Sequence, residues 1–210
     1  MVSKTDIFFF AKTIDGISKD EWNDCTGLDH PFTRYEYFHA LEKSNSAVNT
    51  TGWQPFHYIQ LNSKKKIVAL CPLYVKSHSF GEYIFDHTWA EAYHRCGLEY
   101  YPKLQSAIPF TPVTGERIIV HANIKNKNDT KYNIIKNIIN KAQTLNVSSL
   151  HFNFLKKPEY LSKDDNELLL RQGIQFHWKN DNYKSFDEFL KTLSSRKRKV
   201  IIKERTCIKK

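Results

Sequence analysis

The side chains able to move protons or bind metal are densest between residues 72 and 115. This group consists of His78, Asp86, His87, Glu91 and His94. On a helix that starts near His87, positions 87, 91 and 94 share one face, a spacing compatible with metal ligands. The HExxH pattern is absent, however, and a hydrogen-bonded pocket wall or a plain structural role accounts for the same residues. We therefore predict no metal site.

Nucleophilic catalysis finds little support in this stretch. Cys96 follows Arg95, a neighbour that can activate a thiol, but a buried thiol at a helix end is the favoured interpretation. Ser77 and Ser79 flank His78 without a GxSxG motif, and adjacent strand residues point to opposite faces. No glycine-rich phosphate loop occurs anywhere in the chain. The sequence therefore argues against a serine hydrolase and shows no evident loop for a cofactor's pyrophosphate.

The composition of residues 72–115 points to a shaped pocket instead. The stretch holds nine of the 29 aromatic residues and four of the seven prolines, but only seven charged residues. Rigid turns combined with large amphipathic rings are typical of a polar and aromatic binding pocket. We expect the functional site to begin in this stretch.

The whole chain has the composition of a globular protein. Its 210 residues are 40% hydrophobic, enough for one substantial core, or for one domain and part of another. It has no run of 18 apolar residues and no signal-peptide pattern, so we expect no membrane span and a cytoplasmic location. Four cysteines are scattered without a CxxC pair, which predicts reduced and mostly buried thiols. They are Cys25, Cys71, Cys96 and Cys207.

Positive charge is concentrated near the C-terminus. Residues 184–210 hold ten Lys or Arg and three Asp or Glu, and so contribute +7 to the net charge of +10. The run RKRK at 196–199 opens a predicted helix. Phosphate binding and a solvated helix face are equally consistent with this run. Because aromatic residues are not interleaved with the cations, sequence-specific nucleic-acid recognition is disfavoured.

Hydrophobic periodicity and turn signals predict an α/β or α+β order of elements. The expected helices are 18–25, 34–44, 88–96, 129–145, 160–171, 185–193 and one that runs from 194 or 195 to 210. The expected strands are 6–10, 53–61, 67–77, 83–85, 117–120, 148–154 and 174–178. We expect 53–61 to pair with 67–77, with Pro72 marking a bulge or an unpaired edge.

Six segments carry a family resemblance. They are TGWQPFHY at 51–58, the stretch 72–104, PFTPVTGERI at 109–118, SSLHFNF at 148–154, QFHWKNDNYKSFDEFL at 175–190 and LSSRKRKVIIKER at 193–205. Together they closely resemble the FemAB-like predicted N-acyltransferases of bacteria, a family associated with peptidoglycan biosynthesis or recognition within the GNAT superfamily. The resemblance spans about 51–205 and is specific, because the segments recur in the same order.

The resemblance implies two GNAT-like halves related by duplication, each a mixed sheet flanked by helices, with the substrate in a cleft between or beside them. Family members look longer than this chain, and its basic helix is similar to the one that opens their second half. We therefore expect a first GNAT-like domain at 1–180 and the truncated start of a second at 181–210.

The resemblance also implies the reactants. The donor would be acyl-CoA or aminoacyl-tRNA, with its site largely in the missing half, and the acceptor an amine-bearing small molecule or muropeptide. tRNA is thus a possible partner. No metal is implied, and the sequence does not specify the oligomeric state.

Chemistry suggests roles for residues in the family's segments. Amide formation needs a base for the acceptor amine, for which Glu82, Asp86 or His87 would serve, and a donor to the oxyanion, Tyr83 or Tyr101. Arg196, Lys197 and Arg198 would approach a phosphate-rich donor. The expected acceptor-binding residues are His78, Trp89, Tyr93, Arg95, Tyr101, Lys103, Thr111 and Thr114.

These expectations describe the first half of an N-acyltransferase, inactive or impaired on its own. Two alternatives stay open at this point. One is an acceptor-binding or regulatory module without transfer activity. The other is a binder of nucleic acid or of an anionic surface through the basic C-terminal helix.

Overall fold

A computed structural model describes residues 7–156 and 168–208 of the chain. These residues belong to two compact units, one within 1–166 and one within 167–210. The expected division into GNAT-like domains at residue 180 stays a prediction. None of the helices in the described ranges is long and apolar enough to cross a lipid bilayer.

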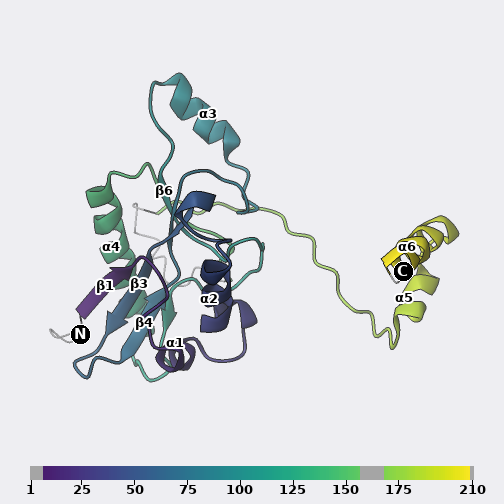
Figure 1. The fold of residues 1–210 in the computed structure, drawn as a ribbon, viewed down its shortest axis with the longest axis horizontal. Coiled ribbons are helices and arrows are strands. Elements are labelled where there is room, and N and C mark those ends of the chain that lie inside the picture. The colour runs from purple at the N-terminus through teal and green to yellow at the C-terminus, as the bar shows by residue number, and fades with distance from the viewer. Residues whose placement is uncertain (1–6, 157–167, 209–210) are drawn as a thin grey trace. The chain divides into compact units, whose positions relative to one another are not determined.

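The larger unit contains two four-stranded sheets (Figure 1). Sheet A has the strand order β1-β3-β4-β7, and sheet B has the order β2-β5-β6-β8. Only the β6–β8 pair is parallel among these strands. The strands are β1 Ile7–Ala11, β2 Trp53–Pro55, β3 His57–Leu61, β4 Ile67–Cys71, β5 Tyr74–Lys76, β6 Lys103–Ser106, β7 Ile119–Val120 and β8 Leu150–Phe152.

The predicted pairing of 53–61 with 67–77 is confirmed, but each segment is shared between the two sheets. β3 pairs with β4 in sheet A, and β2 pairs with β5 in sheet B. The chain changes sheets at Phe56 and at Pro72, and the Phe56 amide donates to the Leu73 carbonyl at 2.8 Å across this point. Because proline has no N–H for a ladder bond, Pro72 suits a break between strands.

Helices cover both faces of sheet A. On one face, Trp22 of α1 packs with Ile59 in the main hydrophobic core. On the other face, Asn137 of α4 donates to the Tyr58 hydroxyl at 3.1 Å. Successive strand residues point to opposite faces, so Tyr58 and Ile59 meet different helices. The helices of this unit are α1 Lys19–Thr26, α2 Tyr35–Lys43, α3 His87–Arg95 and α4 Lys127–Leu145, with short 3-10 turns η1 Pro31–Thr33 and η2 Asn49–Thr51.

The expected mixed α/β class is therefore confirmed, and several local signals are too. Ser18 caps α1 by accepting a hydrogen bond from the Glu21 amide at 3.4 Å. The apolar stripe predicted for α4 is buried at Ile134, Ile135 and Ile138. α3 differs from the other helices of the unit because none of its nine residues is buried, and it projects away from the sheets (Figure 1).

Three predicted elements differ from the structure. Residues 83–85 form a loop in which Tyr83 has a φ of +58°, and residues 174–178 are irregular, so both strand predictions are wrong. Aromatic residues are favoured in strands, but no strand in the described part of the chain pairs with either segment. The helix predicted at 160–171 falls mostly outside the described residues. β6 was missed because KLQS shows no apolar alternation.

The smaller unit consists of irregular chain followed by two helices, α5 Phe186–Thr192 and α6 Ser195–Ile208. Ser185 caps α5 as expected, accepting from the Glu188 amide at 3.2 Å. Arg198 joins the helices by donating through Nε to the Leu190 carbonyl at 3.0 Å and through Nη2 to the Leu193 carbonyl at 3.0 Å. The side chain of Arg198 thus satisfies carbonyls at the end of α5.

Arg117 holds together the loop before β7 and the chain after β8. Its fully buried guanidinium donates to the backbone carbonyls of Asn153 at 2.8 Å, Val113 at 2.5 Å and Glu116 at 3.3 Å. These carbonyls would lose a buried donor if the guanidinium were removed.

We expect Arg117→Met to lower the free energy of unfolding by about 2–4 kcal/mol, because the buried Asn153 carbonyl and two partly buried carbonyls lose their hydrogen-bond donor. Urea unfolding followed by circular dichroism measures this loss. Arg95→Met, at an exposed position on α3, is the matched control and should change stability by less than about 0.5 kcal/mol. Equal stability of the two variants would contradict the role given to Arg117.

Candidate functional site

Four charged side chains meet in the interior of the larger unit, where each is at most 1% exposed. We call Lys76, Glu82, Asp86 and Lys103 the Lys103 cluster. Lys76 on β5 and Lys103 on β6 are direct cross-strand partners, so the register places two cations on the same face of sheet B. Glu82 and Asp86 come from the loop between β5 and α3 and neutralise them.

Lys103 is the centre of this cluster. Its ammonium nitrogen lies 2.8 Å from Glu82 Oε2, 2.5 Å from Asp86 Oδ2 and 2.9 Å from Ser79 Oγ. An ammonium group has three protons to donate, so these three contacts use its full capacity. The loop that contains Ser79, Glu82 and Asp86 is therefore fixed to β6 at three points.

Lys76 is held more loosely. Its Nζ lies 3.9 Å from Glu82 Oε1, 3.4 Å from the Phe80 carbonyl oxygen and 3.6 Å from the centroid of the Trp53 ring. Burial lowers the pKa of Lys76 to about 7, with Glu82 opposing the shift and Lys103 adding to it. Lys76 therefore changes its charge near neutral pH, unlike an exposed lysine.

The pKa values of Glu82 and Asp86 are shifted in opposite directions. Burial raises the pKa of Glu82, although Lys103 and Lys76 act against this shift. Burial also acts to raise the pKa of Asp86, but hydrogen bonds from Lys103 and Tyr100 are among the effects that outweigh it, and the net pKa is lowered. The Tyr100 hydroxyl donates to Asp86 Oδ2 at 2.7 Å. Glu82 is therefore the carboxyl group of the pair that more readily takes a proton.

A second layer of polar groups surrounds the Lys103 cluster. With its amide oriented to satisfy its neighbours, Gln105 donates to Glu82 Oε2 at 2.7 Å and accepts from Asn153 at 3.1 Å. The Ser79 hydroxyl lies 2.7 Å from the hydroxyl of Tyr101. These bonds extend the network from β6 to the chain after β8 and to Tyr101.

The structure brings together four of the residues predicted for the site, namely Glu82, Asp86, Lys103 and Tyr101. His87 and Tyr83, the other predicted catalytic residues, are exposed and lie outside these contacts. Trp89 and Arg95 are exposed on α3, while the Tyr93 ring packs edge-on against Tyr100 at 5.2 Å. His78 packs against Phe80, and Thr111 and Thr114 lie partly buried in the loop before β7.

The three residues predicted to bind a phosphate-rich donor lie on α6 and differ in what they contact. Arg196 and Lys197 are exposed. Arg198 donates to carbonyls of α5 and the residue after it, as described above. Only the first two therefore present their charge to a ligand in the described part of the chain.

Sequence reasoning missed Lys76, Ser79, Tyr100 and Gln105. Lys76 had a detectable signal, because it ends an apolar run and shares a strand face with Tyr74. The others depend on β6, which no sequence pattern marks.

The cysteine prediction is only half correct. Cys25 and Cys71 are buried, and burial raises the pKa of each to about 12. Cys96 and Cys207 are exposed, so the expectation of a buried thiol at Cys96 is wrong. It follows a helix that projects into solvent and has no buried residue. Within the described residues, no group of three or more His, Cys, Asp or Glu is arranged to hold a metal ion.

We expect Lys103→Met to lower the free energy of unfolding by about 3–5 kcal/mol, because two buried carboxyl groups lose their shared cation. The loss should be smaller at pH 5 than at pH 8, since the freed carboxyl groups can then bind protons. Chemical unfolding at both values tests this, with Lys125→Met, at an exposed position, as the control. An equal loss at both values would argue against an electrostatic role.

The burial of Lys76 leads to a separate prediction about how stability depends on pH. Its pKa is about 7 in the folded protein against 10.5 ordinarily, so between these values the unfolded chain binds more protons. The contribution of Lys76 to stability therefore rises with pH in this window. The unfolding free energy of the wild type, minus that of Lys76→Met, should rise from pH 7 to 9 by on the order of 2 kcal/mol. A constant difference would contradict a neutral buried amine.

Comparisons with known proteins identify a family. No curated protein matches the chain. Among solved structures, the aminoglycoside antibiotic 6'-N-acetyltransferase AAC(6')-Ih from Acinetobacter baumannii is similar with a TM-score of 0.42 and 9% identity, over 83% of this chain and 98% of that chain. At these values the similarity supports no argument.

The sequence family gives a definite result. The model of the FemAB-like family, described by peptidoglycan biosynthesis and recognition, matches residues 13–210. The match covers nearly all of the chain and confirms the resemblance carried by its six segments. The chain belongs to the FemAB-like family.

Proposed function

We propose that this protein takes part in N-acyl transfer to an amine of a cell-envelope precursor. The observation that carries this proposal is the family match over residues 13–210, with its description of peptidoglycan biosynthesis and recognition. The resemblance noted in the sequence adds the reaction type, and acyl-CoA or aminoacyl-tRNA as the donor. Muropeptides with a free amine are the proposed acceptors.

The burial of the Lys103 cluster guides the assignment of roles. A general base must come within hydrogen-bond reach of the proton that it removes. Glu82 and Asp86 are each 1% exposed and are bound to Lys103. We therefore assign both as positioning residues that hold the loop leading into α3, rather than as groups that touch the substrate.

His87 and Tyr83 are the proposed contacts with the reacting groups. His87 follows Asp86 directly and is exposed at the first position of α3, and Tyr83, next to Glu82, is 51% exposed. Each exposed residue thus adjoins a residue that Lys103 fixes. A fixed backbone with exposed polar tips provides the prepositioned donors and bases that acyl transfer requires.

The proposed step is the aminolysis of a thioester or ester. The amine nitrogen forms a bond to the acyl carbon while the bond to the CoA sulfur or the tRNA ribose oxygen breaks. His87 removes a proton from the amine and returns it to the sulfur or oxygen of the leaving group. Tyr83 donates a hydrogen bond to the carbonyl oxygen as negative charge develops on it.

Two of the predicted acceptor-binding residues keep a binding role in this proposal. Trp89 and Arg95 on α3 are exposed and would contact the acceptor. Phosphate binding by Arg196 and Lys197, which are exposed on α6 in the other compact unit, stays a separate prediction. No contact assigns such a role to Thr111 or Thr114.

Substitution of His87 tests the proposed base. With muropeptide acceptors and acyl-CoA or aminoacyl-tRNA as donor, His87→Gln should lower the single-turnover rate at least about tenfold. His94→Gln is the matched control, because His94 is also exposed on α3. Its rate should equal that of the wild type.

Two outcomes would count against this assignment. An unchanged rate in His87→Gln would remove His87 as the base, and equal losses in both variants would indicate a general effect on α3. Binding of muropeptide without any transfer by the wild type would favour the acceptor-binding module.

A further inference from the structure

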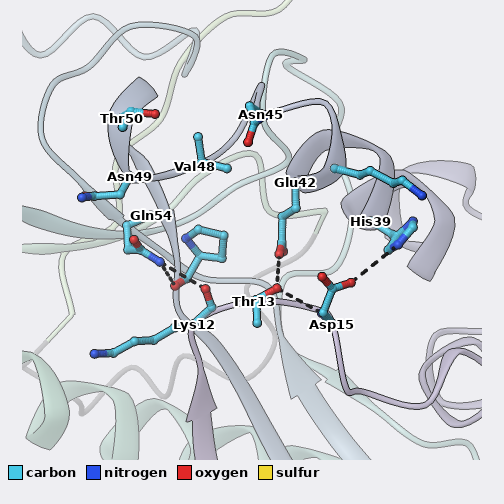
Figure 2. A pocket seen from close by; sticks show the side chains of 12 residues that line it. Lys12, Thr13, Asp15, His39, Glu42, Asn45, Val48, Asn49, Thr50 and Gln54 are labelled. Carbon is cyan, nitrogen blue, oxygen red and sulfur yellow. Dashed lines mark hydrogen bonds and ion pairs between the residues drawn. The ribbon is translucent and has the colours of Figure 1, made fainter.

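A polar hollow of about 610 Å³ lies where the chain leaves β1, beside the end of α2 and the turn η2 (Figure 2). This volume lies within the range typical of small-molecule sites. Its lining is formed mainly by charged, amide and hydroxyl side chains. The hollow shares no residue with the Lys103 cluster, so its chemistry can be considered independently.

Glu42 is the most buried charged group of the lining, with a side chain 10% exposed. Its Oε2 accepts hydrogen bonds from the Thr13 hydroxyl and the Ile14 amide, both at 2.8 Å, and its Oε1 lies 3.2 Å from His57 Nε2. His57 Nδ1 accepts from the Leu73 amide at 3.2 Å, so the proton of a neutral ring is on Nε2. All three donors to Glu42 are therefore uncharged.

With His57 in this neutral form, Glu42 holds a negative charge without a cationic partner, whereas a protonated His57 would form an ion pair with it. Burial acts to raise its pKa, but the hydrogen bonds from His57 and Ile14 help to outweigh burial, and the pKa is lowered. No lysine or arginine of the described residues lies within ion-pair distance of Glu42. A carboxylate has about four acceptor positions, of which three are used. One position therefore remains for a donor, and a cationic donor would neutralise a buried charge.

The side of the hollow across from Glu42 is mostly uncharged and polar, although the lining also includes Lys12 and Lys43. Figure 2 shows Asn49, Thr50 and Gln54 across from Glu42, with Asn45 near the rim. The side chains of Asn45, Asn49 and Thr50 make no hydrogen bonds within the described part of the chain. Amides and hydroxyls arranged in this way suit the hydroxyl or amide groups of a polar ligand.

We propose that the hollow binds a small polar ligand through a protonated primary amine, which donates to Glu42, while Asn45, Asn49 and Thr50 contact hydroxyl or amide groups of the same ligand. Two ligand classes share this chemistry, amino sugars and amino acids with an amine at the end of the side chain. The proposal does not depend on acyl transfer.

Binding of four probes to the wild-type protein tests the need for the amine. Glucosamine and 6-aminohexanoate carry a primary amine, and N-acetylglucosamine and 6-acetamidohexanoate are the same molecules with the amine acetylated. We expect at least one amine to bind with a Kd below about 10 mM by NMR titration, and its acetylated form to bind at least about tenfold more weakly. The stronger amine identifies the ligand class.

Variants then locate the binding. Glu42→Gln keeps the side-chain size and should weaken amine binding at least about tenfold. Asn49→Ala combined with Thr50→Val removes two rim groups whose side chains are exposed, and should weaken binding at least about threefold even if Glu42→Gln does not fold. Asp20→Asn, an exposed carboxylate on α1 outside the lining, is the control and should leave the Kd unchanged.

Three results would overturn the proposal. The first is a Kd above about 10 mM for both amines. The second is equal binding of an amine and its acetylated form. The third is wild-type affinity in a folded Glu42→Gln variant or in the Asn49 and Thr50 double variant.

Discussion

Two lysines that face each other across a buried strand pair impose the main constraint on this fold. Lys76 and Lys103 are cross-strand partners on β5 and β6, and neither reaches solvent. Like charges in this arrangement repel, and each loses its hydration. The loop after β5 resolves the conflict, because it brings Glu82 to both lysines and Asp86 to Lys103. The path of this loop is thus decided by charge rather than by a hydrophobic anchor.

The burial of these charges also explains why polar and aromatic side chains are exposed in the same loop. Burying Glu82 and Asp86 turns the residues between and after them outwards, and Tyr83 adopts a φ of +58° in doing so. Phe85, which is 79% exposed, is another consequence. A loop fixed through charge can therefore present large rings to solvent without losing its own structure, which suits a surface that recognises a ligand.

Elements with a strong local signal were predictable from the sequence, whereas the contacts that build the candidate site were not. The period of Ile134 and Ile138 and the cap at Ser18 act within one helix, and both were confirmed. β6 has no such signal, because its polar residues are buried by partners distant in sequence. Glu82 and Asp86 were selected by residue type, but their burial depends on Lys103, which was expected to bind the acceptor. The Glu42 hollow joins three separated segments, and no spacing in the sequence reveals it.

The strand pair β2–β5 connects the hollow beside Glu42 to the Lys103 cluster. Gln54 and Pro55, which line the hollow, belong to β2, and β2 pairs with β5 in a register that sets Trp53 opposite Lys76. A slip of one residue would turn Lys76 to the other face of the sheet, so the ladder cannot slide gradually. The hollow and the Lys103 cluster therefore depend on the same strand register, and a change in that register would displace residues of both.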